Sequence, residues 1–130
     1  MIFLTSMAAV CGAARTATYS ATKAFDLVLA EGLWAELAPQ GVDVLALVAG
    51  ATRTPAMARS GAHIGTEEFP GMDPDEVARE GLTNLAHGPT WIAGEGNRGA
   101  YEFLRALPRA EVVNLMSQAV RTLYELPDDA

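Results

Sequence analysis

The chain has 130 residues, of which 50% are hydrophobic and 19% are charged, and its formal net charge is −7. This length and composition fit one globular domain, whereas the acidic balance argues against binding to nucleic acid or to an anionic membrane. The single cysteine, Cys11, cannot form an internal disulfide and belongs to no Cys/His metal-ligand pattern, so we expect a buried thiol and no metal site. The sequence contains no signal-peptide pattern and no apolar run of membrane-spanning length, and we therefore expect a soluble, cytoplasmic protein.

The first predicted element is a short strand at residues 2–5, a continuous apolar run with β-branched and aromatic side chains. Such a run is typical of a strand that is buried on both faces of a parallel sheet. A loop of small residues follows, and then an apolar pattern from about Tyr19 to Ala38 predicts a long helix. Because this helix is apolar around most of its circumference, one face can pack on the sheet and the other face needs a partner helix or subunit.

Pro39 and Gly41 end the helix, and residues 42–48 predict a second strand, so that a parallel crossover is expected. Residues 58–72 are rich in glycine and proline, a composition typical of a mobile loop. The fold class that these patterns predict is α/β, with three parallel strands and helices on the faces. The remaining expected elements are a helix from the N-cap Asp73 to about His87, a strand at 90–93, helices at 100–107 and 110–126, and a frayed tail at 127–130.

Residues 94–99 match the pattern Gly-x-Gly-x-x-Gly, but we do not interpret them as a dinucleotide-binding fingerprint. That fingerprint requires a helix, a second strand and an acid about twenty residues later. Here Pro108 interrupts the helical pattern and another helix follows, and Glu95 would place a negative charge against a pyrophosphate. We expect a chance match in a loop.

Tyr19 and Lys23 are the centre of a catalytic hypothesis. They stand four residues apart at the start of the long predicted helix, so their side chains share one face. An ammonium beside a phenol favours the phenolate and lowers the pKa of the phenol from about 10 towards neutral, which suits a group that exchanges protons. Lys23 is the only lysine in the chain, and Ser6 stands upstream at the end of the first predicted strand. The alternative is a solvated pair on a helix surface.

The segment from Ala49 to Pro55 follows the second strand, at the sheet edge where ligands of open α/β sheets bind. Gly50 permits close approach of the backbone to a ligand, and Thr54 offers a hydroxyl near a helix start. The alternative is structural, with Thr54 as the cap of a helix that begins at Pro55. Further along, His63 could contact a substrate.

Together these residues resemble the active-site segment of the short-chain dehydrogenase/reductase family. The resemblance covers nearly the whole chain and implies a partial Rossmann-like three-layer fold, in which residues 1–130 correspond to the C-terminal catalytic half of the family's domain. The family's usual proline before the glycine is Ala49 here. The resemblance is based on Thr5-Ser6, Gly12, Tyr19-Ser20-Ala21-Thr22-Lys23-Ala24, Gly41-Val42-Asp43-Val44 and Ala49-Gly50-Ala51-Thr52-Arg53-Thr54-Pro55, in the family's order.

The resemblance implies reversible hydride transfer between a nicotinamide cofactor, NAD or NADP, and a carbonyl or alcohol substrate. Tyr19 would be the general acid in reduction and the base in oxidation, Lys23 would depress its pKa and hydrogen-bond the nicotinamide ribose, and Ser6 would hold and polarise the substrate oxygen. The implied cofactor-binding residues are Tyr19, Lys23, Gly50, Thr52 and Thr54.

Two interpretations of the chain's length stay open. The family's Gly-rich cofactor-binding half and its Asn-Asn-Ala-Gly stretch are not encoded in these residues. The chain is then either a fragment or the product of a mis-set start codon, or a genuine short protein that is a catalytically inactive interaction module. We expect the isolated chain to be inactive, to bind a dinucleotide weakly and to form a homo-oligomer through the helix at 19–38. Neither the substrate nor the choice between NAD and NADP follows from the sequence.

Overall fold

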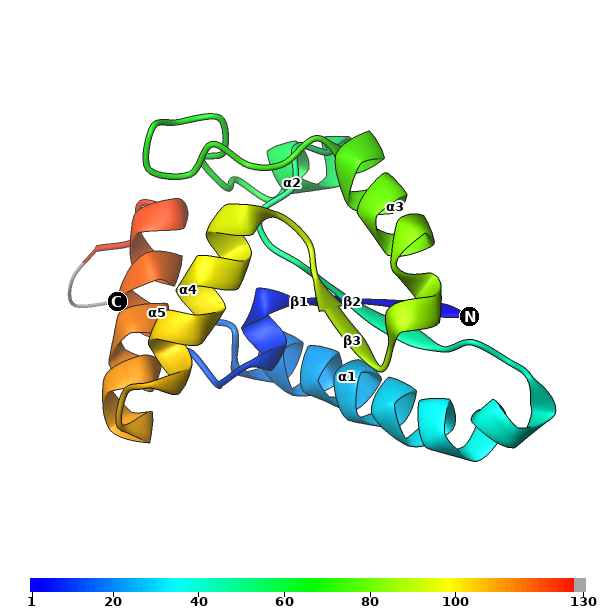
Figure 1. The fold of residues 1–130 in the computed structure, drawn as a ribbon. Coiled ribbons are helices and arrows are strands. Elements are labelled where there is room, and N and C mark those ends of the chain that lie inside the picture. Colours follow the sequence, from blue (N-terminus) through cyan, green and yellow to red (C-terminus); the bar gives the residue numbers. More distant parts are fainter. Residues whose placement is uncertain (128–130) are drawn as a thin grey trace.

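The structure, a computed structural model, describes residues 1–127 (Figure 1). Its sheet has three parallel strands in the order β1 (Ile2–Ser6), β2 (Leu45–Ala49) and β3 (Thr90–Ile92). Ile2 pairs with Leu45 and Ser6 with Ala49, so the carboxyl ends of β1 and β2 are level. The predicted α/β fold with three parallel strands is confirmed.

The helices differ from the prediction mainly at their ends. The long helix α1 begins two residues earlier than expected, and the helix that opens at Asp73 ends at Thr83, before a short 3-10 turn at Leu85–His87. None of the helices within residues 1–127 has the length and apolar character needed to cross a bilayer. Their bounds are η1 Met7–Ala9, α1 Ala17–Leu37, η2 Ala38–Gln40, α2 Pro55–Arg59, α3 Pro74–Thr83, η3 Leu85–His87, α4 Glu95–Arg105 and α5 Arg109–Leu123.

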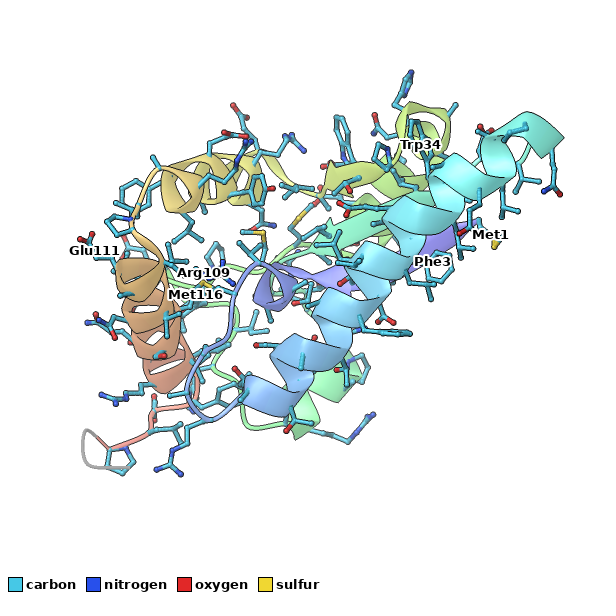
Figure 2. The ribbon with its side chains drawn as sticks, turned by 90° about the horizontal axis from the view of Figure 1, so that it is seen from below. Met1, Phe3, Trp34, Arg109, Glu111 and Met116 are labelled. Carbon is cyan, nitrogen blue, oxygen red and sulfur yellow. The ribbon has the colours of Figure 1, made fainter. Side chains whose placement is uncertain are left out.

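The central strand β2 is buried on both faces, because successive side chains of a strand point to opposite sides. Ala46 packs with Ala30 on the α1 side, and Phe3 joins that cluster (Figure 2). Leu47 packs with Val77 on the α3 side. The sheet therefore separates two helical layers.

A third cluster lies beyond the carboxyl ends of the strands, where α4 and α5 pack on the segment that follows β1 (Figure 1). Its buried members are Cys11, Leu104 and Val112, and Met116 covers them (Figure 2). Burial raises the pKa of the Cys11 thiol, and the Arg109 guanidinium opposes this rise only in part. The thiol stays protonated and serves as a packing group, as expected.

The Glu80 side chain links α3 to β3 and to the start of α4 through hydrogen bonds. Its carboxylate accepts hydrogen bonds from Trp91 Nε1 at 2.8 Å, from Arg98 Nη1 at 2.9 Å and from the Gly94 backbone N–H at 3.1 Å. Arg98 also lies over the Trp91 ring, 5.2 Å from its centroid. Burial alone would raise the pKa of Glu80, but the hydrogen bonds from Trp91, Arg98 and Gly94 outweigh it and lower the pKa below its ordinary value of 4.5.

Two expectations about burial and helix limits were wrong. The strand β1 is not buried on both faces: Thr5, on the side of α1, is buried, but Leu4, on the opposite face, is 57% exposed, because α3 packs over β2 and not over β1. Residues 95–99 are not a loop, because α4 already begins at Glu95. Gly94 takes a positive φ of 85° as its N-cap, and Glu95 adds a favourable negative charge in the first turn.

Candidate active site

The predicted site residues gather at the carboxyl edge of the sheet. Ser6 is the last residue of β1 and is the register partner of Ala49, after which the Gly50 loop begins. The start of α1 packs along the same strand, since Thr5 Oγ1 donates to the Lys23 backbone carbonyl at 2.7 Å. This is the edge at which ligands of open α/β sheets bind.

Ser6 is half-buried and also caps the 3-10 turn η1, because its Oγ accepts a hydrogen bond from the Ala8 backbone N–H at 3.1 Å. A hydroxyl that accepts one hydrogen bond keeps its own hydrogen for donation. Ser6 can therefore donate to an oxygen atom placed at the sheet edge.

Tyr19 and Lys23 lie in the first two turns of α1. Tyr19 is 49% exposed, so its phenol is accessible. The Lys23 ammonium donates to the Leu4 carbonyl at 3.1 Å and pairs with Asp26 Oδ2 at 3.4 Å. These contacts bring the start of α1 to the strand that carries Ser6. Within residues 1–127 no direct hydrogen bond joins the Tyr19 phenol to Lys23 or to Ser6.

Asp26 was missed at the sequence level. Its carboxylate holds the Lys23 ammonium from the next turn of the helix. The i,i+3 spacing of opposite charges was the signal that would have found it. Asp26 thus places a negative charge beside the Lys23 ammonium.

The hydroxyls of the two threonines in the loop after β2 form hydrogen bonds with backbone groups two or three residues away. Thr52 Oγ1 donates to the Gly50 carbonyl at 3.1 Å, and Thr54 Oγ1 accepts from the Met57 backbone N–H at 3.2 Å as the N-cap of α2. The structural alternative for Thr54, a capped helix start, is therefore present. A cofactor role does not conflict with it, because a capping hydroxyl still has a hydrogen to donate.

Gly50 lies in close contact with Asn97 in α4. A Cβ atom at position 50 would lie 2.5 Å from Asn97 Oδ1, which no side chain tolerates without a shift. Asn97 is held in place because its Nδ2 donates to the Ala93 carbonyl at 2.7 Å. Asn97 lies inside the glycine pattern that we set aside, and no sequence signal pointed to this contact.

The segment at 58–72 is attached to the end of α5. The His63 backbone N–H donates to the Leu123 carbonyl at 2.8 Å, and His63 Nδ1 lies 3.2 Å from Glu125 Oε1. That His63 contacts a substrate stays a prediction. In the structure the His63 ring lies beside the Glu125 carboxylate. His63 thus links the loop beside the sheet edge to α5.

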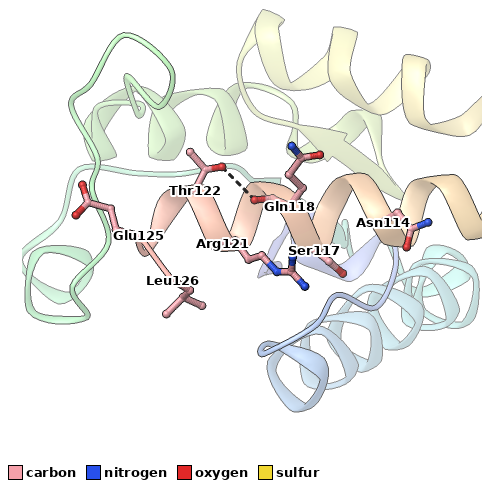
Figure 3. A pocket seen from close by; sticks show the side chains of 7 residues that line it. All are labelled: Asn114, Ser117, Gln118, Arg121, Thr122, Glu125 and Leu126. Atoms are coloured by element: carbon pink, nitrogen blue, oxygen red, sulfur yellow. Dashed lines mark hydrogen bonds between the residues drawn. The ribbon is translucent and has the colours of Figure 1, made fainter. Parts of the chain in front are cut away.

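Two grooves lie on the surface of the helices, and neither is lined by the predicted site residues. One of about 540 Å³ runs along the second half of α5, and its polar lining includes Ser117 and Arg121 (Figure 3). The other, of about 580 Å³, is apolar and lies along α1 between Ala21 and Glu36. No group of three or more His, Cys, Asp or Glu side chains suited to a metal ion occurs in the part of the chain that the structure describes.

Comparison with known proteins gives the family. The model of the family described as short chain dehydrogenase matches residues 1–65. A 7beta-hydroxysteroid dehydrogenase from Clostridium sardiniense is 32% identical over 97 residues, which are 75% of this chain and 37% of that protein. A solved structure from a study of 7beta-hydroxysteroid dehydrogenase stereoselectivity is similar with a TM-score of 0.76 and 28% identity, over 88% of this chain and 44% of that chain. The chain spans less than half the length of these relatives, and it belongs to the short-chain dehydrogenase/reductase family.

Proposed function

We propose that this chain carries the catalytic residues of an NAD(P)-dependent oxidoreductase that transfers hydride reversibly between a nicotinamide cofactor and a carbonyl or alcohol substrate. The contact that supports this best is the one from the Lys23 ammonium to the Leu4 carbonyl, 3.1 Å away. It joins the start of α1, which carries Tyr19, to the end of β1, which carries Ser6. Membership of the family supports the same assignment.

Each of the three residues has a distinct role in this proposal. Tyr19 donates a proton to the carbonyl oxygen during reduction and accepts it during oxidation, for which its exposed phenol is accessible. Ser6 donates a hydrogen bond to the same oxygen. Lys23 supplies a fixed positive charge one turn from Tyr19, and Asp26 together with the Leu4 carbonyl restrains its ammonium.

The residues at the sheet edge fit the nicotinamide end of a dinucleotide. When bound, NAD or NADP supplies or accepts the hydride. Lys23 is proposed to hydrogen-bond the ribose, and the loop with Gly50, Thr52 and Thr54 is proposed to line the nicotinamide. A cytoplasmic location, where NAD and NADP are abundant, is part of the proposal.

Hydroxysteroids are the substrates to test first. The relatives of this chain include a 7beta-hydroxysteroid dehydrogenase. We therefore propose a secondary alcohol on a bulky scaffold as the substrate class.

The test is turnover by the longest form of the protein that the gene encodes, followed at the absorbance of the reduced nicotinamide. Tyr19→Phe removes only the proton-transfer group and should lower kcat by about 10²-fold or more with an unchanged Tm. Tyr101→Phe, on α4, is the matched control and should keep full activity. If the Tyr19→Phe protein retained most of its turnover, the proposed mechanism would be wrong.

We also propose that the isolated chain self-associates through α1. Phe25 and Val28 are 66% and 65% exposed, and they line the apolar groove on this helix. A few hundred Å² of exposed apolar surface represent several kcal/mol of drive towards association at roughly 25 cal/mol per Å². A second copy of the chain offers the same surface.

Sedimentation and titration with reduced nicotinamide dinucleotide test this second proposal. The wild-type chain should sediment as a dimer or larger species and bind the dinucleotide weakly. Phe25→Ser with Val28→Ser should shift it towards monomer. A wild-type monomer that binds the dinucleotide at micromolar concentration would refute both expectations.

A further inference from the structure

The Asn97 side chain in α4 lies between the ends of β2 and β3. A Cβ atom built at Gly50 would lie 2.5 Å from Asn97 Oδ1 and 2.6 Å from its Nδ2, so the amide packs directly against this glycine. Asn97 Nδ2 donates to the Ala93 carbonyl at 2.7 Å, and the Ala93 N–H donates to the Val48 carbonyl at 2.9 Å. Asn97 therefore joins the start of α4 to the loop at residues 50–54, called the Gly50 loop here (Figure 1).

Met72 holds the same loop from the segment that precedes α3. Its backbone N–H donates to the Ala51 carbonyl, and the Arg53 N–H donates to the Met72 carbonyl, both at 2.9 Å. The Met72 sulfur lies 3.6 Å from Asn97 Nδ2 and is a weak acceptor for it. The Asn97 amide thus contacts both the Gly50 loop and the residue that pairs with this loop.

The position of Gly50 also affects a proposed cofactor residue. The Thr52 hydroxyl donates to the Gly50 carbonyl at 3.1 Å, so a shift of Gly50 moves the acceptor that orients this hydroxyl. The three atoms nearest to a Cβ at Gly50 all belong to the Asn97 amide. Binding residues need support that holds them to within about 0.5 Å of the productive geometry. Asn97 is placed to give the Gly50 loop this support.

On the basis of the proposed function, we infer that Asn97 is a positioning residue for the nicotinamide cofactor. It acts through Gly50 and Thr52, which are proposed to line the nicotinamide, and not as a member of a phosphate-binding fingerprint. Removing the Asn97 amide frees the Gly50 loop to move and lowers the affinity for the dinucleotide.

The next residue of α4, Arg98, provides a matched control. Its Nη1 donates to the Ile92 carbonyl at 2.9 Å, as Asn97 donates to the Ala93 carbonyl, so both side chains anchor α4 to the end of β3. Arg98 also pairs with Glu80 at 2.9 Å. Within residues 1–127 no hydrogen bond joins the Arg98 side chain to the Gly50 loop. A purely structural role predicts similar behaviour of the two residues, whereas a positioning role separates them.

The test is fluorescence titration of the longest form of the protein that the gene encodes with NADH and with NADPH, together with Tm. Asn97→Ala should raise the Kd of the dinucleotide that the wild type prefers by about tenfold. Arg98→Met should lower Tm at least as much, because it also loses the pair with Glu80, and should keep the wild-type Kd. Asn97→Asp keeps the shape of the side chain, lacks the N–H donor and should also raise Kd; it decides the matter if the alanine variant does not fold.

Three results would overturn the inference. They are a wild-type Kd in the Asn97 variants, an equal rise of Kd in Arg98→Met, and failure of the wild type to bind either dinucleotide at millimolar concentration. The proposed function is judged separately by turnover. A protein that binds the dinucleotide with the expected pattern among the variants, but converts no alcohol or carbonyl compound, would contradict the proposed hydride transfer and leave the role of Asn97 intact.

Discussion

The two edges of the sheet differ in whether their polar and apolar groups find partners within the chain. At the β3 edge, the Glu80 carboxylate is hydrogen-bonded by Trp91, Arg98 and Gly94, and so its charge is neutralised within the chain. At the β1 edge and on the helix α1 that packs against this strand, Leu4 and Phe25 are 57% and 66% exposed, and the Ser20 hydroxyl is buried without a partner in residues 1–127.

This difference predicts which substitutions change stability and which change function. Groups that are satisfied inside the chain contribute to the folded state, whereas exposed apolar and unpartnered polar groups remain available to ligands or other chains. Substitutions at the β3 edge should therefore lower the free energy of unfolding. Substitutions at the β1 edge should lower activity or binding and leave stability nearly unchanged.

The largest loss of stability is expected for Glu80→Ala. It leaves the Trp91 Nε1–H, the Gly94 N–H and the Arg98 guanidinium without their acceptor, which should cost about 2–3 kcal/mol. Glu102→Ala breaks an exposed ion pair on the surface of α4 and should cost less than about 0.5 kcal/mol. Urea unfolding measures both, and equal losses would remove the distinction between the two edges.

A smaller loss is expected for Gly50→Ala. Its Cβ would collide with Asn97, and displacing that hydrogen-bonded side chain should cost about 1–2 kcal/mol. The double variant with Asn97→Ala should be less destabilised than the sum of the two single variants, because the collision is gone. Strict additivity in the thermal unfolding of the four proteins would show that the contact is unimportant.

The low pKa of Glu80 predicts how stability depends on pH. A carboxylate whose pKa is lower in the folded state than its ordinary value of 4.5 contributes stability above that pH. This contribution is lost as the pH falls below 4.5 through the folded-state pKa. The stability difference between the wild type and Glu80→Gln should therefore shrink between pH 5 and more acidic values, and a constant difference would contradict the assignment.

The smallest effect is expected for Gly96→Ala, and it is favourable. Gly96 lies in the first turn of α4 with open space around its Cβ position, so alanine should stabilise the chain by up to about 1 kcal/mol. Dinucleotide affinity should stay the same, because residues 94–99 are not a cofactor fingerprint. A selective loss of nicotinamide binding at unchanged Tm would show that this interpretation is wrong.

The sequence predicted the strands and the long helix because their signals are local. Hydrophobic runs and the breakers at Pro39 and Gly41 gave β2 and α1 to within a few residues, and Asp73 was identified as the cap of α3. The start of α4 was missed, because glycines at 96 and 99 weaken a helical pattern that Gly94 and Glu95 nevertheless begin. The exposure of β1 was missed because a strand's neighbours are a tertiary property.

The candidate site was predicted as a list of residues and not as a set of contacts. Ser6, Tyr19 and Lys23 follow from a motif, but the acceptors of the Lys23 ammonium, Leu4 and Asp26, depend on how α1 lies along β1. The contact of Gly50 with Asn97 joins residues far apart in the chain. No single-sequence pattern encodes such a pair.

The most direct test of the central claim measures kcat/KM and Tm together for Lys23→Arg and Glu80→Ala in the longest form of the protein that the gene encodes. A guanidinium cannot reproduce the compact charge of the ammonium. Lys23→Arg should therefore lower kcat/KM by about 10²-fold at nearly unchanged Tm, an amount in the range of a lost acid–base function. Glu80→Ala should lower Tm and keep the activity of the folded fraction. A Lys23→Arg protein with wild-type activity, or a Glu80→Ala protein that loses activity at full stability, would contradict the account.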